Sequence, residues 1–139
     1  MTSIWKKTAA VAVTVIGIWF ASEWWEKGLA SPSGEPVISS DGCTRVQAFK
    51  PFWLLPDIFH AEYRPNDDGK ARWFSSWEAP GFFRLYNHQS GELIGETVIY
   101  DLEFSGGPLR WYQSGEVWVG MTYLGKRVES CSPVKSEHK

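Results

Sequence analysis

The 139-residue sequence contains only 2 Cys and 3 His, and its 14 Lys and Arg do not outnumber its 16 Asp and Glu. A formal net charge of −2 argues against a nucleic-acid-binding protein, which normally carries a basic patch or stripe. The two cysteines lie far apart, outside any CxxC motif and without clustered histidines. The sequence therefore predicts no metal site and no bound cofactor.

Signatures of catalysis are also missing, since the chain has no GxSxG, no HExxH and no phosphate-cradling glycine loop. His60 follows Asp57 by three residues, but on a strand these two side chains would point to opposite faces and could not easily cooperate. His88 falls in an expected hairpin turn, where a solvated side chain is the usual outcome. We therefore expect no catalytic residue and no enzymatic activity.

Two acidic clusters allow a second interpretation. Residues 66–69 (NDDG) could bind calcium, but they lack the alternating spacing and distant Glu of a calcium loop, and an Asx-rich turn explains them. Asp101 and Glu103 alternate along one expected strand and could form a carboxylate pair, although a solvated acidic edge is the simpler interpretation. Neither cluster alone predicts a functional site.

The chain has one long uncharged run, TAAVAVTVIGIWFAS, which covers residues 8–22. Lys6 and Lys7 precede the run and Trp24 and Trp25 follow it, an arrangement typical of the two ends of a membrane-spanning helix. Its 15 residues fall short of the roughly 20 that a span needs, but flanking interface residues extend the helix to about 22. The sequence predicts a signal-anchor over residues 1–27, with the N-terminus inside and the remainder translocated.

A cleaved signal peptide and a buried helix are the alternatives to an anchor. Signal peptidase requires small residues at the first and third positions before the cut. Cleavage near Ala21 would put Trp19 or Phe20 at the third position, and the small residues of 28–30 lie eight residues beyond the run. The uncleaved anchor is therefore favoured.

Cys43 and Cys131 are consistent with export. In an oxidising compartment we expect them to pair, which would join two residues 88 positions apart. The loop-entropy model gives such a bond about 4.5 kcal/mol of stabilisation before native strain is subtracted. Two buried free thiols are the alternative.

Residues 28–41 are rich in Pro, Ser and Gly and predict a linker, followed by a β domain over 42–133 and a disordered tail over 134–139. Residues 50–56 are apolar but bracketed by prolines, and they predict a packing loop. Short aromatic and β-branched runs separated by turn clusters favour antiparallel hairpins. The predicted fold class is mainly β, an anchor helix followed by an antiparallel β-sandwich or curled β-sheet. The expected strands cover residues 44–49, 58–64, 72–77, 82–86, 93–100, 109–112, 117–122 and 126–129.

Aromatic residues make up 16% of the sequence, which excludes intrinsic disorder. Four of the 9 Trp lie in the first 25 residues, and the rest belong to a domain too small to bury all its aromatic side chains. Exposed Trp and Tyr beside Arg are typical of interface hot spots, and a thick aromatic core is the alternative. The candidate partner interface comprises Trp73, Trp77, Phe82, Arg84, Tyr86, Trp111, Tyr112 and Trp118.

The KK-apolar-WW anchor and the run RLYNHQSGELIGETVIY, from Arg84 to Tyr100, resemble small single-pass envelope proteins of enterobacteria, some of them type VI secretion immunity proteins. The resembling parts contain no motif that names a binding residue. The resemblance implies an inner-membrane protein whose C-terminal domain, in the periplasm, binds a secreted toxin and occludes it. The alternative is a structural or accessory subunit of an envelope complex, whose Trp-rich helix packs on other helices.

Overall fold

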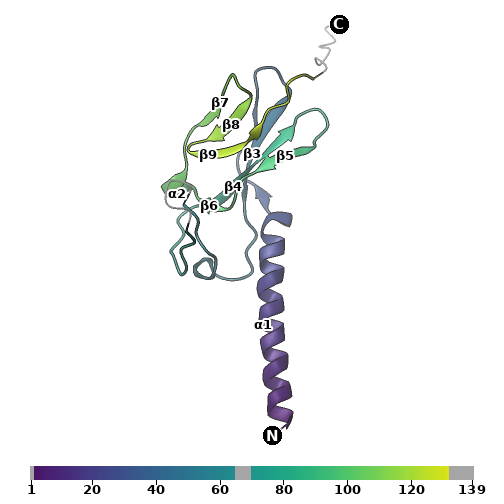
Figure 1. Ribbon diagram of the computed structural model, residues 1–139, viewed down its shortest axis with the longest axis vertical. Helices are drawn as coiled ribbons and strands as arrows, with labels where there is room; N and C mark the ends of the chain where they lie inside the picture. Colours follow the sequence, from purple (N-terminus) through teal and green to yellow (C-terminus); the bar gives the residue numbers. More distant parts are fainter. Residues whose placement is uncertain (1, 65–69, 132–139) are drawn as a thin grey trace.

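The computed structural model describes residues 2–64 and 70–131. A long helix, α1 (Thr2–Gly28), projects from a β domain (Figure 1). At 1.5 Å per residue its 27 residues extend about 40 Å, more than the roughly 30 Å of a bilayer core. Its most apolar 18-residue stretch is not buried against any other part of the described chain. The N-terminal segment is therefore a helix long and apolar enough to cross a membrane.

The larger sheet is built around two long antiparallel strands, β3 (Thr44–Lys50) and β4 (Pro80–Asn87). Their register runs from the pair of Thr44 and Asn87 to the pair of Phe49 and Phe82. β5 (Leu93–Glu96) and β6 (Tyr100–Asp101) both pair antiparallel with β4. The predicted strands at residues 44–49 and 82–86 are confirmed.

The segment over residues 28–41, for which the sequence predicts a linker, contributes two strands to this sheet. β1 (Ser31–Pro32) and β2 (Val37–Ile38) pair antiparallel with β3. The N–H of Ser33 also donates to the carbonyl of Ala48, at 2.8 Å. Backbone pairing needs no apolar pattern, so a stretch rich in Pro, Ser and Gly can occupy a sheet edge. α1 consequently enters the sheet almost directly, with two residues between Gly28 and β1.

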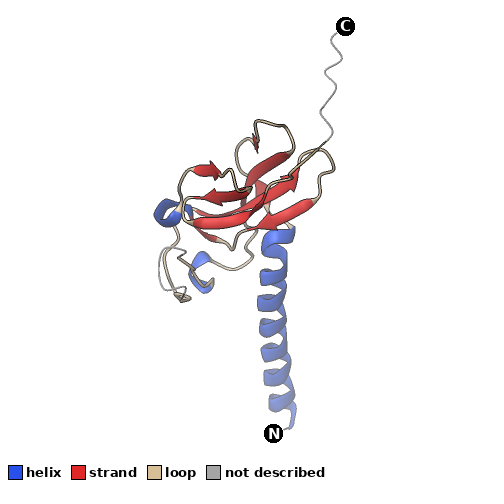
Figure 2. Ribbon diagram, turned by 45° about the horizontal axis from the view of Figure 1, so that its top comes forward, coloured by secondary structure: helices blue, strands red, loops and turns tan. Residues whose placement is uncertain are grey.

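The smaller sheet contains β7 (Leu109–Trp111), β8 (Glu116–Val119) and β9 (Thr122–Lys126), in that order and antiparallel (Figure 2). A single helical turn, α2 (Leu102–Ser105), precedes it. The carboxylate of Asp101 caps α2 by accepting a hydrogen bond from the N–H of Glu103. The described chain is therefore mainly β, with an N-terminal helix and two antiparallel sheets, as the sequence predicts at that level.

The two sheets share one core cluster. Val46 and Leu85 of the larger sheet pack with Val117 and Leu124 of the smaller sheet, and all four are buried. Full burial of such side chains contributes about 1.5–3 kcal/mol each. Gly95 lets the sheets approach, because a Cβ there would collide with the backbone carbonyl of Leu124.

Two expected strands are not strands in the structure. Residues 58–64 begin in a one-turn 3-10 helix (Asp57–Phe59) and then contribute only an isolated bridge between Glu62 and Arg72. Residues 72–77 form a loop in which Phe74 has a left-handed backbone with φ of 59°. Of the Phe, Tyr and Trp side chains in these two segments, Trp77 is buried in a core cluster and the others stay exposed near α1. A β-type composition therefore did not produce β pairing here.

Other boundaries also shift. The expected strand at 93–100 divides into β5 and β6, and β9 ends at Lys126, where the sequence predicts that a strand begins. Residues 51–56 form the predicted loop. The predictions for residues 66–69 and for the tail at 134–139 lie outside the described residues.

Cys43 and Cys131 lie at disulfide distance, with their Cα atoms 5.6 Å apart. The C-terminal segment is held there by the N–H of Val128, which donates to Oγ1 of Thr44 at 3.0 Å. Next to this pair, the pKa of Asp41 is lowered by a hydrogen bond from the Ser39 hydroxyl and by the N–H of Cys43. The cysteine pair thus joins the start of β3 to the end of the described chain.

Candidate functional site

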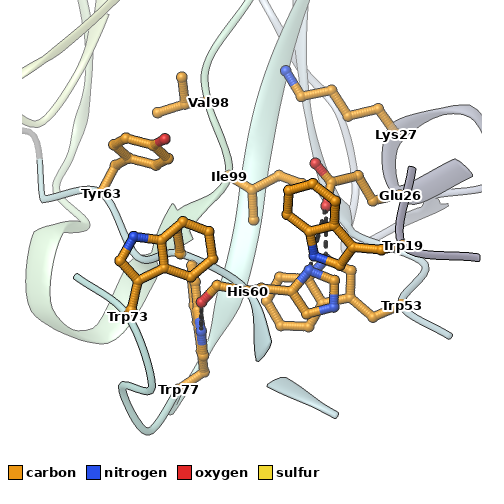
Figure 3. Close-up of a pocket in the computed structure, with 11 residues that line it drawn as sticks. Trp19, Glu26, Lys27, Trp53, His60, Tyr63, Trp73, Trp77, Val98 and Ile99 are labelled. Carbon is orange, nitrogen blue, oxygen red and sulfur yellow. Dashed lines mark hydrogen bonds and ion pairs between the residues drawn. The ribbon is translucent and has the colours of Figure 1, made fainter. Parts of the chain in front are cut away.

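Glu26, in the last turn of α1, connects the helix to the loop over residues 51–60. Its carbonyl accepts a hydrogen bond from the N–H of Phe52 at 2.9 Å. Its Oε2 accepts one from Nε1 of Trp53 at 3.0 Å and lies 3.8 Å from Nδ1 of His60 (Figure 3). The His60 ring is 4% exposed and stacks on Trp53 with a centroid distance of 4.1 Å. Glu26 therefore holds the end of α1 against the loop through its carbonyl, and its carboxylate positions the stacked pair of Trp53 and His60.

Lys27 connects the same turn of α1 to the larger sheet. Its Nζ donates to the carbonyl of Thr97 at 2.9 Å and to Oε1 of Glu96 at 3.2 Å. Arg84 donates to the other Glu96 oxygen at 3.1 Å and to the Lys27 carbonyl at 3.0 Å. Burial raises the pKa of Glu96, but the hydrogen bonds and positive charges of Arg84 and Lys27 outweigh burial and leave the pKa lowered. These polar contacts fix the direction of α1 relative to the sheet.

A cavity of about 310 Å³ opens at this junction (Figure 3). Trp77 is buried beside it, and its Nε1 donates to the His60 carbonyl at 3.3 Å. Tyr63 and Val98 are exposed around the cavity. Within residues 2–64 and 70–131, no three His, Cys, Asp or Glu side chains converge as a metal site. The cavity walls are mainly aromatic and carry a few polar groups, a composition typical of sites that bind a ligand or a partner without catalysis. The lining residues are Trp19, Glu26, Lys27, Trp53, His60, Ala61, Tyr63, Trp73, Trp77, Val98 and Ile99.

The smaller sheet presents aromatic side chains on the face that points away from the core. Along β8 and β9 the buried residues alternate with Trp118 and Tyr123, whose ring centroids are 5.4 Å apart. Tyr123 is 46% exposed, and Nε1 of Trp118 donates to Oε2 of Glu116 at 3.2 Å. Arg110 pairs with Trp118 across β7 and β8. Arg110, Tyr112, Trp118 and Tyr123 together form the outer aromatic face.

Three of the eight residues predicted to form a partner interface point inward instead. Trp77 and Phe82 are buried in a second core cluster that also contains Phe49 and Ile99. Trp111 is partly buried and packs on the core cluster between the sheets. The prediction that Trp77 and Phe82 lie at a partner interface is therefore not met. Their side chains fill the core at the α1 end of the domain.

The other five predicted residues lie on separate parts of the domain. Arg84 forms an ion pair with Glu96 and stacks over the Phe82 ring. Tyr86 is partly buried against the second core cluster. Trp73 is 53% exposed and lies beside the cavity near α1. Tyr112, 42% exposed, and Trp118 belong to the outer aromatic face. The structure thus brings together only Tyr112 and Trp118 and adds Arg110 and Tyr123 to them.

The polar residues considered as catalytic candidates have local structural roles. His60 contacts Glu26 of α1, and the N–H of His88 donates to the Cys43 carbonyl at 2.9 Å in the turn after β4. The Asp101 carboxylate is 1% exposed and accepts hydrogen bonds from the N–H groups of Glu78, Ala79 and Glu103. Asp101 therefore anchors the backbone at the start of β4.

The predicted membrane flanks lie at the two ends of the apolar part of α1. Lys6 and Lys7 are exposed near its start. Trp24 is 78% exposed and Trp25 is partly buried near its end. Lys7 and Trp24 are about 25 Å apart at 1.5 Å per residue.

Neither the family models, the curated proteins nor the solved structures include a match to this chain. The fold and the site define a class, a small mainly β domain carried on one N-terminal helix that is long and apolar enough to cross a membrane.

Sequence reasoning missed the cluster of Glu26, Trp53 and His60. These residues are separated by 27 and 7 positions along the chain and meet only because the loop folds back against α1. One feature of the sequence indicates that this loop packs on another part of the chain: residues 51–56 combine Phe and Trp with two flanking prolines directly after a strand.

Proposed function

We propose that this chain is a membrane-anchored periplasmic binding protein that neutralises an envelope-acting toxin by occluding it. α1 is its single inner-membrane span. The domain, which we take to be a β-sandwich, is its rigid binding scaffold. The proposal rests on the outer aromatic face, a surface of residues typical of protein interfaces. Contacts of Glu26 and Lys27 fix the orientation of this surface relative to α1.

The membrane placement is supported by the charge and composition of α1. Lys6 and Lys7 precede the uncharged run, and such basic residues favour a cytoplasmic N-terminus. The domain that follows would then lie in the periplasm. The disulfide distance between Cys43 and Cys131 suits that oxidising compartment.

The binding role is supported by the chemistry of the outer aromatic face. Trp, Tyr and Arg are the residue types that dominate interface hot spots. Tyr112 and Tyr123 are both more than two-fifths exposed. Trp118 pairs with Tyr123 across β8 and β9, and Tyr112 directly follows β7 on the other side of β8. β7 and β8 lie towards the end of the domain away from α1 (Figure 1). A protein bound there would not meet the bilayer, and tethering would keep the inhibitor concentrated where the toxin acts.

The test uses the protein encoded by the adjacent gene, produced in the periplasm through an export signal. We expect this neighbour to arrest growth alone and to be harmless when the full chain is present. A Trp118→Ala and Tyr123→Ala double variant should lose protection, while a Trp73→Ala variant should keep it. A harmless neighbour, or protection that survives the double variant, would contradict the proposal. Copurification only with other membrane proteins, through α1, would instead indicate an accessory subunit.

A further inference from the structure

The segment between β3 and β4 leaves the sheet and descends beside the upper half of α1 (Figures 1 and 2). Its described parts are residues 51–64 and 70–79. Phe59, Trp73 and Phe74 of this segment are 45%, 53% and 72% exposed. Large apolar side chains are thus presented next to the helix without being covered by the described chain.

An open apolar groove of about 530 Å³ separates these loops from α1. Val15, Ile16 and Ile18 form its helix wall, and all three are about half exposed or more. Leu55 and Phe59 lie on the loop wall. None of the described residues that line the groove is charged, and the described chain leaves the space between its two walls open.

The height of the groove along α1 indicates what covers it. Val15 and Ile18 lie 8 and 11 residues after Lys7, which is about 12–17 Å along the helix. They therefore lie within the uncharged run, at a level where a spanning helix is surrounded by lipid acyl chains. The groove is continuous with the helix surface that would face those chains.

Phe74 adds an independent observation on the loop wall. Its φ of 59° is in the left-handed region, which a bulky L residue rarely adopts and which is strained. This strained backbone presents the most exposed Phe of the described domain to the groove. In water both the strain and the exposure would be unfavourable, whereas an apolar partner would offset them.

A polar cavity adjoins the upper end of the groove. Trp19 and Trp73 line both the groove and the cavity of Figure 3, so the two spaces adjoin. The cavity carries Glu26, Lys27 and His60, whereas the groove is apolar. This order, apolar near the membrane centre and polar near its surface, matches a lipid of the periplasmic leaflet.

We propose that the groove binds one acyl chain of a membrane phospholipid, whose polar head lies at the cavity. The loops then contact the membrane together with α1 and hold the domain close to the bilayer surface. The inference rests on the membrane placement of α1 in the proposed function, but not on the identity of a protein partner.

Photocrosslinking of the full chain in lipid nanodiscs tests this inference. The probe is a phosphatidylethanolamine with a diazirine at the end of one acyl chain, and labelled residues are located by mass spectrometry. We expect label on α1 and also on residues 55–59 and 73–74. A Phe59→Ser and Phe74→Gly double variant should reduce loop labelling about tenfold, the effect of losing about 1.4 kcal/mol of apolar contact. Labelling of α1 should not change, and a Tyr112→Ser variant should behave like the parent chain.

The outcomes separate the inference from the function. Labelled α1 with unlabelled loops overturns the inference alone, as does loop labelling that the double variant leaves unchanged. Absence of label on both α1 and the loops overturns the membrane placement and the inference with it. The thermal midpoint of the double variant checks that it is folded, and Gly at position 74 is compatible with the observed φ.

Discussion

Lys27 at the end of α1 and Glu96 in β5 form an ion pair of 3.2 Å although they are 69 residues apart in the sequence. Arg84 of β4 shares Glu96 with Lys27 and also donates to the Lys27 carbonyl. A helix that could swing on a linker would not keep this geometry. The domain therefore has a defined orientation on its helix, which decides which of its surfaces face a membrane and which face away.

The first prediction concerns this ion pair. Glu96→Gln should lower the free energy of unfolding by about 0.5–1 kcal/mol at pH 7, the range for partly exposed pairs. The lowered pKa of Glu96 means that its stabilisation is present at neutral pH and is lost as the pH falls below the ordinary value of 4.5. Urea titrations in detergent at several pH values measure the difference. The exposed Glu92→Gln variant is the control, and a deficit that persists in strong acid would contradict this explanation.

The second prediction concerns Cys43 and Cys131. Replacing both by Ser should lower the free energy of unfolding by up to about 4.5 kcal/mol, because the unfolded chain regains the entropy of an 88-residue loop. A reductant should lower the urea midpoint of the parent chain and leave that of the double variant unchanged. Equal stability of the oxidised parent and the variant would show that the pair is not a bond in solution.

The third prediction concerns Tyr100 of β6, which is fully buried. Burial raises its pKa to about 12 from an ordinary 10.0, an effect that the nearby Thr122 hydroxyl only partly offsets. Between these values the unfolded phenol loses its proton while the folded phenol keeps it, so rising pH favours unfolding by up to about 3 kcal/mol. Tyr100→Phe should flatten this alkaline decline, as seen by fluorescence-monitored unfolding. The exposed Tyr112→Phe is the matched control and should decline like the parent.

The fourth prediction concerns the outer aromatic face. Trp118→Ala and Tyr123→Ala should each weaken binding of the adjacent-gene protein tenfold or more, as truncation of central hot spots does. Both side chains are partly or largely exposed, so the thermal midpoint should change little. Biolayer interferometry with the detergent-solubilised full chain gives the dissociation constants. If Trp73→Ala weakened binding and the other two did not, the interface would lie at the α1 end instead.

The order of residue types along the chain predicted the helix and the two central strands, because each of these elements depends on neighbouring residues. The basic, apolar and aromatic order around residues 8–22 predicted a helix long enough to span a membrane, and TRVQAF and FFRLY predicted the two central strands. The same rule failed at residues 58–64 and 72–77, which form loops near α1 in which most aromatic side chains stay exposed. Aromatic composition does not say whether a residue will lie on a strand or in a loop, or whether the rest of the chain will cover it.

The candidate site could be predicted only in part. Residue type pointed to Tyr112 and Trp118, which lie on the outer aromatic face, whereas Trp77 and Phe82, predicted by the same rule, are buried in the core. Adjacent aromatics on a strand point to opposite faces, but the sequence does not say which face a second sheet or a loop will cover. Arg110 and Tyr123 belong to the outer aromatic face because both pair with Trp118, one across β7 and β8 and the other across β8 and β9.

The sequence by itself determined the apolar helix, the mainly β character of the domain and a cysteine spacing compatible with one long-range bond. These features follow from periodicity, composition and charge order, all of which act over a few neighbouring residues. The tertiary structure alone decided that residues 28–41 pair with β3, that Glu26 and Lys27 lock α1 to the domain, and that an apolar groove opens beside Val15. Each of these depends on contacts between residues far apart in the chain, and such contacts leave no local pattern.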